Sequence, residues 1–161
     1  MMKMLVFTVL LVFTPIVVSD YAEFPISTNP AGQGIVQADG NYLVWMDLRN
    51  GATNADIYGY DLAKGEEFAI CTAQGMQRWP RISDDIVVWA DERSSTMAIY
   101  GYNLRTKTEF PVSTYLSNKR TLCIEAGKVL WFDDRGGKWQ LFIKELSSEA
   151  ETALCEVSVQ A

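Results

Sequence analysis

Three aspartate–arginine pairs recur along the chain, and their types and spacing are the first to suggest chemistry. The pairs are Asp47/Arg49, Asp91/Arg93 and Asp133/Arg135. Three carboxylates that converge on one site could perform general acid–base catalysis. A structural device, however, returns with every repeat, whereas an active site is used once and breaks the symmetry. Because residues i and i+2 lie on one face of a strand, we expect each pair to cap its own strand, with no catalytic residue among them.

Each pair belongs to a longer phrase that the sequence states three times. A tryptophan stands two residues before each aspartate, and Trp45, Trp89 and Trp131 lie 44 and then 42 residues apart. Two further phrases return with them, one rich in tyrosine at 57–62, 99–104 and, loosely, 141–146, and one beginning Glu-Phe at 23–28, 67–72 and 109–114. A period of this length indicates a repeat protein, and units of four short strands predict the blades of a β-propeller.

The second unit shows the predicted blade most clearly. Its strands are expected at 79–83, 86–90, 97–104 and 109–113, with polar turns between them. We therefore predict an all-β fold with three four-stranded antiparallel blades, forming a partial propeller or a ring shared by several chains. The domain would span 20–161, with blade units at about 23–66, 67–108 and 109–151 and a last outer strand at 152–159. The stretch 23–28 reads as an outer strand that has no preceding blade.

The first 19 residues have the pattern of a secretory signal peptide. Lys3 gives a basic start, residues 4–18 form a mostly apolar run that Pro15 interrupts, and 17–19 offer small residues for cleavage. The run is short for a membrane span of about 20 residues, which favours cleavage over an uncleaved anchor. We therefore expect an extracytoplasmic protein (periplasmic, secreted or on the cell surface) with no membrane span after cleavage.

Composition narrows the classes of function. The 161 residues carry a net charge of −6, which argues against nucleic acid and anionic membranes as partners. The absence of histidine excludes Ser-His-Asp and Cys-His nucleophile systems and His-ligated zinc enzymes. Cys71, Cys123 and Cys155 lack the close spacing of a zinc site, so we expect three small, half-buried residues, with no metal and no cofactor.

Four residues stand outside the repeated phrases and are the candidate binding residues. Three are aromatic and could stack on a peptide or a sugar: Tyr42, Tyr115 and Trp139. Unpaired aromatics in a β-rich protein are nonetheless more often part of the core or rim than of a ligand platform. The fourth is Glu125, an acid at the place where Ser83 and Ala38 stand in the other units.

The loop 47–56 is rich in oxygen-bearing side chains that could hold calcium. Its last residue, Asp56, has no acidic counterpart, because Ala98 and Gln140 replace it in the other units. Calcium prefers six or more oxygen ligands, so an ordinary hairpin turn is the favoured interpretation.

The repeated phrases resemble those of TolB-type β-propeller proteins, a secreted and periplasmic family. The likeness rests on Val-Val-Trp-x-Asp-x-Arg, as at 87–93, Asp-Ile-Tyr-Gly-Tyr-Asp-Leu, as at 56–62, and Gly-Glu-Glu-Phe-x-Ile, as at 65–70. It covers about residues 23–155 in three copies, of which the third departs at 141–144. The resemblance implies an extracytoplasmic propeller of six or seven blades that most often serves as a protein-interaction scaffold. The chain has no room for the amino-terminal α/β domain of TolB, so the specific role of TolB in a cell-envelope complex is not carried over.

Three functional hypotheses stay open on this basis. The first is a secreted, non-enzymatic module that binds a protein or peptide partner through its loop face. The second is a carbohydrate-binding or carboxylate-based carbohydrate-active protein, with two acids flanking a sugar and Glu125 as the best-placed acid. The third is a structural component of the cell surface or envelope. Three blades would also leave two apolar faces uncovered, so several chains could associate to complete a ring.

Overall fold

Short polar turns separate twelve strands in the computed structural model, which describes residues 23–156. The predicted signal peptide at 1–19 and the last residues of the predicted strand at 152–159 lie outside this range. The first sheet contains β1 (Gln33–Asp39), β2 (Tyr42–Asp47), β3 (Asp56–Asp61) and β4 (Glu66–Cys71). The second contains β5 (Gln77–Ser83), β6 (Ile86–Asp91), β7 (Ala98–Asn103) and β8 (Thr108–Ser113). The third contains β9 (Lys119–Glu125), β10 (Lys128–Asp133), β11 (Gln140–Glu145) and β12 (Glu151–Glu156).

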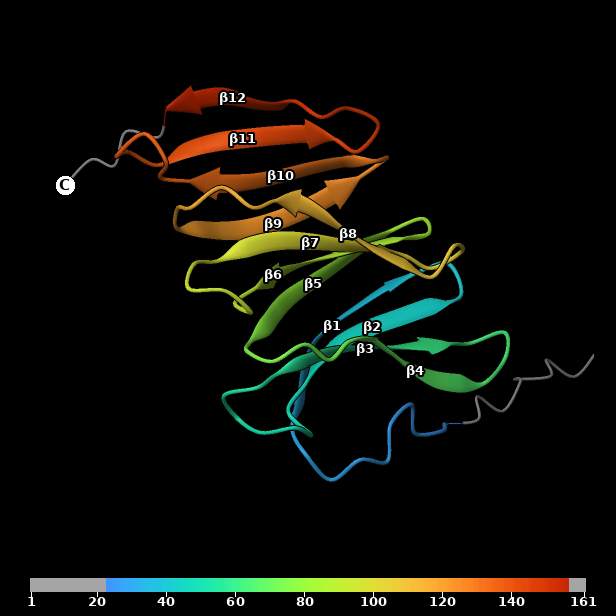
Figure 1. Ribbon diagram of the computed structural model, residues 1–161. Coiled ribbons are helices and arrows are strands. Elements are labelled where there is room, and N and C mark those ends of the chain that lie inside the picture. The colour runs from blue at the N-terminus through green and yellow to red at the C-terminus, as the bar shows by residue number, and fades with distance from the viewer. Residues whose placement is uncertain (1–22, 157–161) are drawn as a thin grey trace, which may run out of the picture.

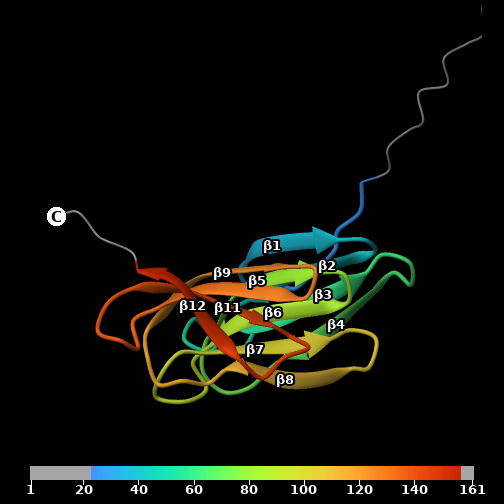
Figure 2. The same cartoon turned by 90° about the horizontal axis from the view of Figure 1, so that it is seen from above.

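Each sheet is an antiparallel meander whose strands pair in chain order. The three sheets follow one another from the bottom to the top of Figure 1, each packed against the next. Seen from above in Figure 2, the first strands β1, β5 and β9 gather on one side, and β4 and β8 lie on the opposite side. This arrangement confirms the predicted all-β fold of four-stranded antiparallel propeller blades.

Packing of a sheet on either side explains why β6, the second strand of the middle sheet, is apolar on both faces. In β6, Val87, Val88 and Trp89 have no exposed surface. Successive side chains of a strand point to opposite faces, so Val87 joins the cluster between the first and second sheets and Val88 joins the cluster between the second and third. The hydrophobic core therefore lies in two layers, one at each junction between sheets.

Glycine in the tyrosine-rich phrase makes room for an aromatic ring on the neighbouring strand. A side chain at Gly101 would place its Cβ 2.5 Å from the Phe110 ring, and a side chain at Gly59 would place it 2.8 Å from Phe68. In the third sheet the corresponding pair is Ile143 opposite Thr152, without the glycine and without the ring. The third copy therefore departs from the phrase in both strands together, which keeps the local volume filled.

The sheets are out of phase with the predicted blade units. They span 33–71, 77–113 and 119–156, so the Glu-Phe phrase forms the fourth strand of the first two sheets and does not open a new unit. The strands expected for the second unit, with 109–113 as the fourth, agree with β5 to β8, and only the unit boundaries differ. The prediction of an outer strand at 23–28 is wrong, because these residues form no strand. They instead run as irregular chain beside the first sheet, at the bottom of Figure 1, and pair with no strand of it.

Candidate functional site

Each repeated tryptophan–aspartate–arginine set forms one hydrogen-bonded network. In the second sheet the indole Nε1–H of Trp89 donates to Asp91 at 2.8 Å, and the backbone N–H of Arg93 donates to the same carboxylate at 2.9 Å. The Arg93 guanidinium pairs with Asp91, at 2.7 Å, and with Glu109 of β8, at 2.7 Å, and it lies 4.1 Å from the ring centroid of Tyr100. The corresponding sets are Trp45, Asp47, Arg49, Glu67 and Tyr58 in the first sheet, and Trp131, Asp133, Arg135, Glu151 and Phe142 in the third.

The aspartate carboxylates of these networks are fully buried, and for Asp47 and Asp133 the surrounding hydrogen bonds lower the pKa and favour the ionised form. Burial alone would raise the pKa of Asp133, but hydrogen bonds from Arg135, Ser117 and Trp131 outweigh it and hold the pKa at about 2. The pKa of Asp47 is lowered by the same balance of burial against hydrogen bonds. A carboxylate so held offers neither a proton nor an accessible oxygen to a substrate, so the network fastens the second strand to the fourth.

A second repeated device fastens each sheet to the one before it. The Gln77 side chain at the start of β5, oriented so that its amide nitrogen faces two carbonyls, donates to Ala55 and Ala73 at 3.0 Å each. Lys119, at the same position of β9, donates to the carbonyls of Met97, at 3.2 Å, and Tyr115, at 2.5 Å. Met97 and Tyr115 correspond to Ala55 and Ala73, so the two side chains bind equivalent carbonyls.

These carbonyl-binding residues were not among the sequence candidates. Their types differ, with Gln33, Gln77 and Lys119 at one position of the repeat, and they lie outside the repeated phrases. Burial lowers the pKa of Lys119, which the charge of Asp133 at 3.8 Å partly opposes. The only available signal was that a residue able to donate hydrogen bonds stands 12 residues before each signature tryptophan.

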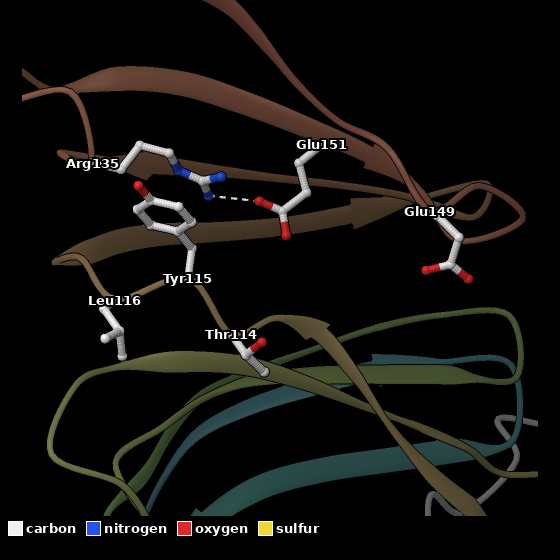
Figure 3. A pocket seen from close by; sticks show the side chains of 6 residues that line it. All are labelled: Thr114, Tyr115, Leu116, Arg135, Glu149 and Glu151. Atoms are coloured by element: carbon white, nitrogen blue, oxygen red, sulfur yellow. Dashed lines mark ion pairs between the residues drawn. The ribbon is translucent and has the colours of Figure 1, made fainter.

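A large cavity opens between the second and third sheets. Its volume is about 720 Å³, and it is lined by Thr114, Tyr115, Leu116, Arg135, Glu149 and Glu151. Figure 3 shows the Tyr115 ring beside the Arg135 guanidinium, with Glu149 standing apart on the loop before β12. The guanidinium lies 4.5 Å from the ring centroid and is paired with Glu151 at 2.6 Å. We call this hollow the Tyr115 pocket.

The Tyr115 pocket has a counterpart at the first sheet. A cavity of about 530 Å³ there is lined by residues that include Asn29, Pro30, Arg49 and Glu67. Arg49 and Glu67 correspond to Arg135 and Glu151, whereas Asn29 and Pro30 stand where the pocket has Tyr115 and Leu116. The arginine–glutamate pair is thus repeated structure, and Tyr115 with Leu116 is the unrepeated part. Both side chains are more than half exposed.

The four sequence candidates lie in different surroundings, and of them only Tyr115 lines the Tyr115 pocket. Tyr42 is half-buried and meets the ring of Phe68 edge-on at the first sheet. Trp139 is half-buried just before β11, with the Arg120 guanidinium 4.2 Å from its ring centroid. The remaining candidate, Glu125, is exposed at the end of β9.

The strand register corrects the sequence alignment at Glu125. Glu125 pairs with Lys128 across a two-residue turn, as Ser83 pairs with Ile86 and as Asp39, not Ala38, pairs with Tyr42. The first sheet therefore carries an acid at the same position. Glu125 is less exceptional than the sequence comparison indicates.

The cysteines differ from one another in exposure. Cys71 is buried, and burial raises the pKa of its thiol to about 12. Cys123 is exposed, so the prediction that it is half-buried is wrong. Its side chain points away from the core because strand residues alternate between faces and its neighbours Leu122 and Ile124 are buried. The side chain of Cys155 lies outside the part of the chain that the structure describes.

The oxygen-rich loop 47–56 contains a buried acid with one unpaired oxygen. Asp56 accepts a hydrogen bond from Asn50 at 2.7 Å through Oδ2, whereas its buried Oδ1 has no partner. Burial, reinforced by the nearby charge of Asp47, raises the pKa of Asp56. Among residues 23–156 no group of three or more acids or cysteines is placed to hold a metal ion.

No protein-family model matches the sequence, and no curated protein matches it. Solved structures match the fold. A protein from Agrobacterium tumefaciens assigned as a TolB superimposes with a TM-score of 0.64 and 14% identity, over 82% of this chain and 52% of that one. TolB from Acinetobacter baumannii gives 0.60 and 17%, over 74% and 31%, and the β-propeller domain of the Trilobed protease from Pyrococcus furiosus gives 0.61 and 18%, over 79% and 42%.

The fold and the comparisons together define the class as β-propeller. The described sheets have the blade architecture of the TolB-type propellers, as the repeated phrases predict, and identities below 20% extend this likeness to the fold alone. The chain spans about half or less of the length of each of these structures. Within residues 23–156 no helix has the length and apolar character needed to cross a membrane.

Proposed function

We propose that this chain is a non-enzymatic binding module of an extracytoplasmic protein and that it holds a protein or peptide partner in the Tyr115 pocket. One observation carries the proposal. Tyr115 and Leu116 are exposed hydrophobic residues at a place where the other repeats have Asn29 and Pro30, or Ala73 and Gln74. A feature that departs from the repeat and places an aromatic ring in a cavity is a candidate for recognition rather than for folding.

The charges of the pocket define the chemistry that it would accept. The Arg135 guanidinium is already paired with Asp133 and Glu151, so it is not available to bind an anion. The exposed Glu149 supplies the outward-facing negative charge, and Tyr115 and Leu116 supply the apolar surface. The complementary ligand is an extended peptide in which an apolar side chain stands next to a lysine or arginine.

A binding role is supported over an enzymatic one by the way the acids are used. The sequence has no histidine, and the signature aspartates are enclosed by arginine and tryptophan. For the carbohydrate hypothesis, Asp85 lies in the two-residue turn after Ser83, and its carboxylate is paired with Arg105. Glu125 is exposed at a position where the side chains of Asp39 and Ser83 accept hydrogen bonds from backbone N–H groups of the next sheet. These acids therefore do not support a glycosidase-like mechanism with two catalytic carboxylates.

The extracytoplasmic location rests on the sequence of residues 1–19 and on the likeness of the repeats to TolB-type proteins. A cleaved leader would place the domain where protein-interaction propellers of this type are expected. Amino-terminal sequencing of the secreted protein tests this part of the proposal. A mature protein that begins near Asp20 supports it, and a cytoplasmic protein that retains Met1 contradicts it.

Binding to a displayed peptide library tests the function itself. The protein is screened, and the peptide that it selects is measured against Tyr115→Ala and against Tyr60→Ala, a matched control from the counterpart cavity at the first sheet. Tyr115→Ala should weaken binding by about tenfold or more, and Tyr60→Ala should leave it unchanged. Equal affinity of both variants would show that the Tyr115 pocket is not the binding site. A screen that selects nothing would instead favour a structural role in the cell envelope.

A further inference from the structure

The exposed face of the third sheet carries apolar side chains at the same positions as the faces of the first and second sheets that are buried by the next sheet. We call the face of a sheet that packs on the following sheet its rear face. Ile70 and Val112 are the extra residues of bulges in β4 and β8, and both are buried on rear faces by the next sheet. Leu154 is the extra residue of the same bulge in β12, and its side chain is 50% exposed.

The remaining rear-face positions follow the same rule. Val44 with Ile57 and Val88 with Ile99 have at most 1% exposed surface, and each pair joins the core between its own sheet and the next. The corresponding residues of the third sheet are Leu130 and Leu141. Both are only half-buried. The third sheet therefore presents three leucines at positions that the first two sheets use to bind a following sheet.

The front face of the first sheet, which looks away from the second sheet, is the matching half. Val36 is 59% exposed, whereas Pro80 and Leu122 at the same position of β5 and β9 are buried against the preceding sheet. Leu62 is 42% exposed, whereas Leu104 at its position in the second sheet is buried. The first sheet thus presents the apolar surface that the second and third sheets use to pack on a preceding sheet.

A polar contact repeats along with these faces. The Asp39 carboxylate accepts a hydrogen bond from the backbone N–H of Asp84 at 2.5 Å, and the Ser83 hydroxyl accepts one from Ala126 at 3.3 Å. In both cases the turn after the first strand of one sheet binds the turn of the next sheet. Glu125 occupies the same position in the third sheet, and its carboxylate makes no hydrogen bond or ion pair to the described residues. The residue of the first sheet at the position of the donors Asp84 and Ala126 is Gly40, so its backbone N–H is the equivalent donor.

We propose that the rear face of the third sheet binds the front face of the first sheet of a second copy of this chain, head to tail. Leu154 and Leu141 would pack on Val36 and Leu62 of the other copy, and the Glu125 carboxylate would accept a hydrogen bond from its Gly40. The argument is continuity, because the same interface is formed twice within one chain. Propellers close with four to eight blades, and two copies of the three described sheets fall within that range, whereas three copies exceed it.

In the single chain, the segment before the first sheet covers part of the front face on which the second copy would dock. Ile26 and Ser27 share a cavity with Val36, Leu43 and Trp45 on the front face. The Gln33 side chain donates to the carbonyl of Asn29 at 3.2 Å, just as Gln77 reaches the corresponding carbonyl of Ala73. This segment has no strand pairing, whereas β12 is paired with β11 from Glu151 to Glu156. The segment is therefore the element that moves aside when the second copy docks.

Native mass measurement of two single variants and their mixture tests the proposal. Leu154→Asp changes the rear face and Val36→Asp changes the front face, and both side chains are exposed in the single chain, so each variant should fold. Leu116→Asp is the control, because Leu116 is exposed but lies on neither face. Each face variant should weaken self-association at least tenfold, and the control should associate like the unchanged protein.

The mixture separates a loss of contact from a loss of folding. In a head-to-tail pair of Leu154→Asp with Val36→Asp, one of the two interfaces carries both charges and the other carries none. Mixing should therefore restore a dimer that contains one chain of each variant, and only folded chains can do this. A protein that stays monomeric at every concentration, or variants that associate as the unchanged chain does, would overturn the proposal.

Glu125 gives a finer test of the same contact. Glu125→Ala should weaken association by about fivefold, because one hydrogen bond to a carboxylate is lost. Glu145→Ala is the matched control, since Glu145 is an exposed acid at the end of β11 of the same sheet. Equal loss from both variants would point to net charge rather than to the contact with Gly40 and would remove Glu125 from the interface.

Discussion

The second and third sheets carry equivalent side chains on their rear faces, and only the second has a neighbour there. Val112 is 2% exposed in the second sheet, whereas Leu154 at the same position of the third is 50% exposed. The residue type is therefore dictated by the repeat, while burial is dictated by the next sheet. The exposed Leu154 therefore stands at a position that the next sheet buries in the other two sheets, and such a position is a candidate for an interface.

Substitution by aspartate on the rear faces of the second and third sheets should give the largest difference in the free energy of unfolding. Val112→Asp should lower the free energy of unfolding by about 4 kcal/mol or more, because it places an unpaired charge in the core between sheets. Leu154→Asp should change it by less than about 1 kcal/mol at concentrations where the protein is monomeric. Denaturant unfolding of both variants measures the difference. Similar losses would mean that the rear face of the third sheet is covered within the single chain.

The signature network provides the next effect, and it depends on pH. The pKa of Asp133 is about 2 in the folded protein, below its value in an unfolded chain, so its contribution is present above about pH 4 and is lost as the pH falls toward 2. Asp133→Asn should cost about 3 kcal/mol at pH 7, since it also removes the ion pair of Arg135.

The pH dependence is the readout of the Asp133 prediction. The stability gap between Asp133→Asn and the unchanged protein should narrow as the pH is lowered from 5 to 2 in unfolding titrations. Glu145→Gln, a change at an exposed acid, should stay within about 0.5 kcal/mol of the unchanged protein throughout. A gap that does not depend on pH would contradict the depressed pKa of Asp133.

The carbonyl-binding residue can be compared between the second sheet, which packs on a preceding sheet, and the first sheet, which has no preceding sheet among the described residues. Gln77 is fully buried and donates to two carbonyls, so Gln77→Ala should destabilise the protein by about 2 kcal/mol. Gln33, at the same position of the first sheet, is exposed, and Gln33→Ala should cost less than about 0.5 kcal/mol in the monomer. Thermal unfolding of the two variants measures both values. A large effect at Gln33 would show that the leading segment is firmly held.

The smallest effect concerns a buried acid that the other sheets lack. Burial raises the pKa of Asp56, so its ionisation destabilises the folded state as the pH rises above the unfolded value of about 4. Asp56→Asn removes this ionisation and should stabilise the protein by about 1 kcal/mol at pH 7, with less gain near pH 3. Stability measured at the two pH values checks the sign. A loss of stability at pH 7 would show that the carboxylate has a favourable partner.

The repeat made the fold and the four strands of the second sheet predictable, whereas the boundaries of the repeat units and the sites were not. A tryptophan recurring about every 43 residues with turn residues between apolar runs is enough for four-stranded blades. Repetition alone cannot say where one sheet ends, because the Glu-Phe phrase at 67–72 is equally periodic in either frame. Hydrogen bonding decides it, since Phe68 pairs with Gly59 of the preceding strand.

The candidate site depended on contacts between distant residues. Tyr115 was a sequence candidate, but the pocket around it is formed by Arg135 and Glu149, which are separated from it by 20 and 34 residues. Lys119 was overlooked because a lysine in place of a glutamine reads as a surface residue, whereas three acceptors around it allow burial. The sequence alignment places Ala38 at the position of Glu125, whereas strand pairing shows that Asp39 is the equivalent residue.

The molar mass of the purified protein in solution tests the central claim most directly. The central claim is that the free faces of the first and third sheets are two halves of one repeated interface. Light scattering over a concentration series should give twice the mass of a single chain at high concentration and should fall toward one chain on dilution. A single-chain mass at every concentration, from a protein that unfolds cooperatively, would contradict the claim and leave both faces as ordinary surface.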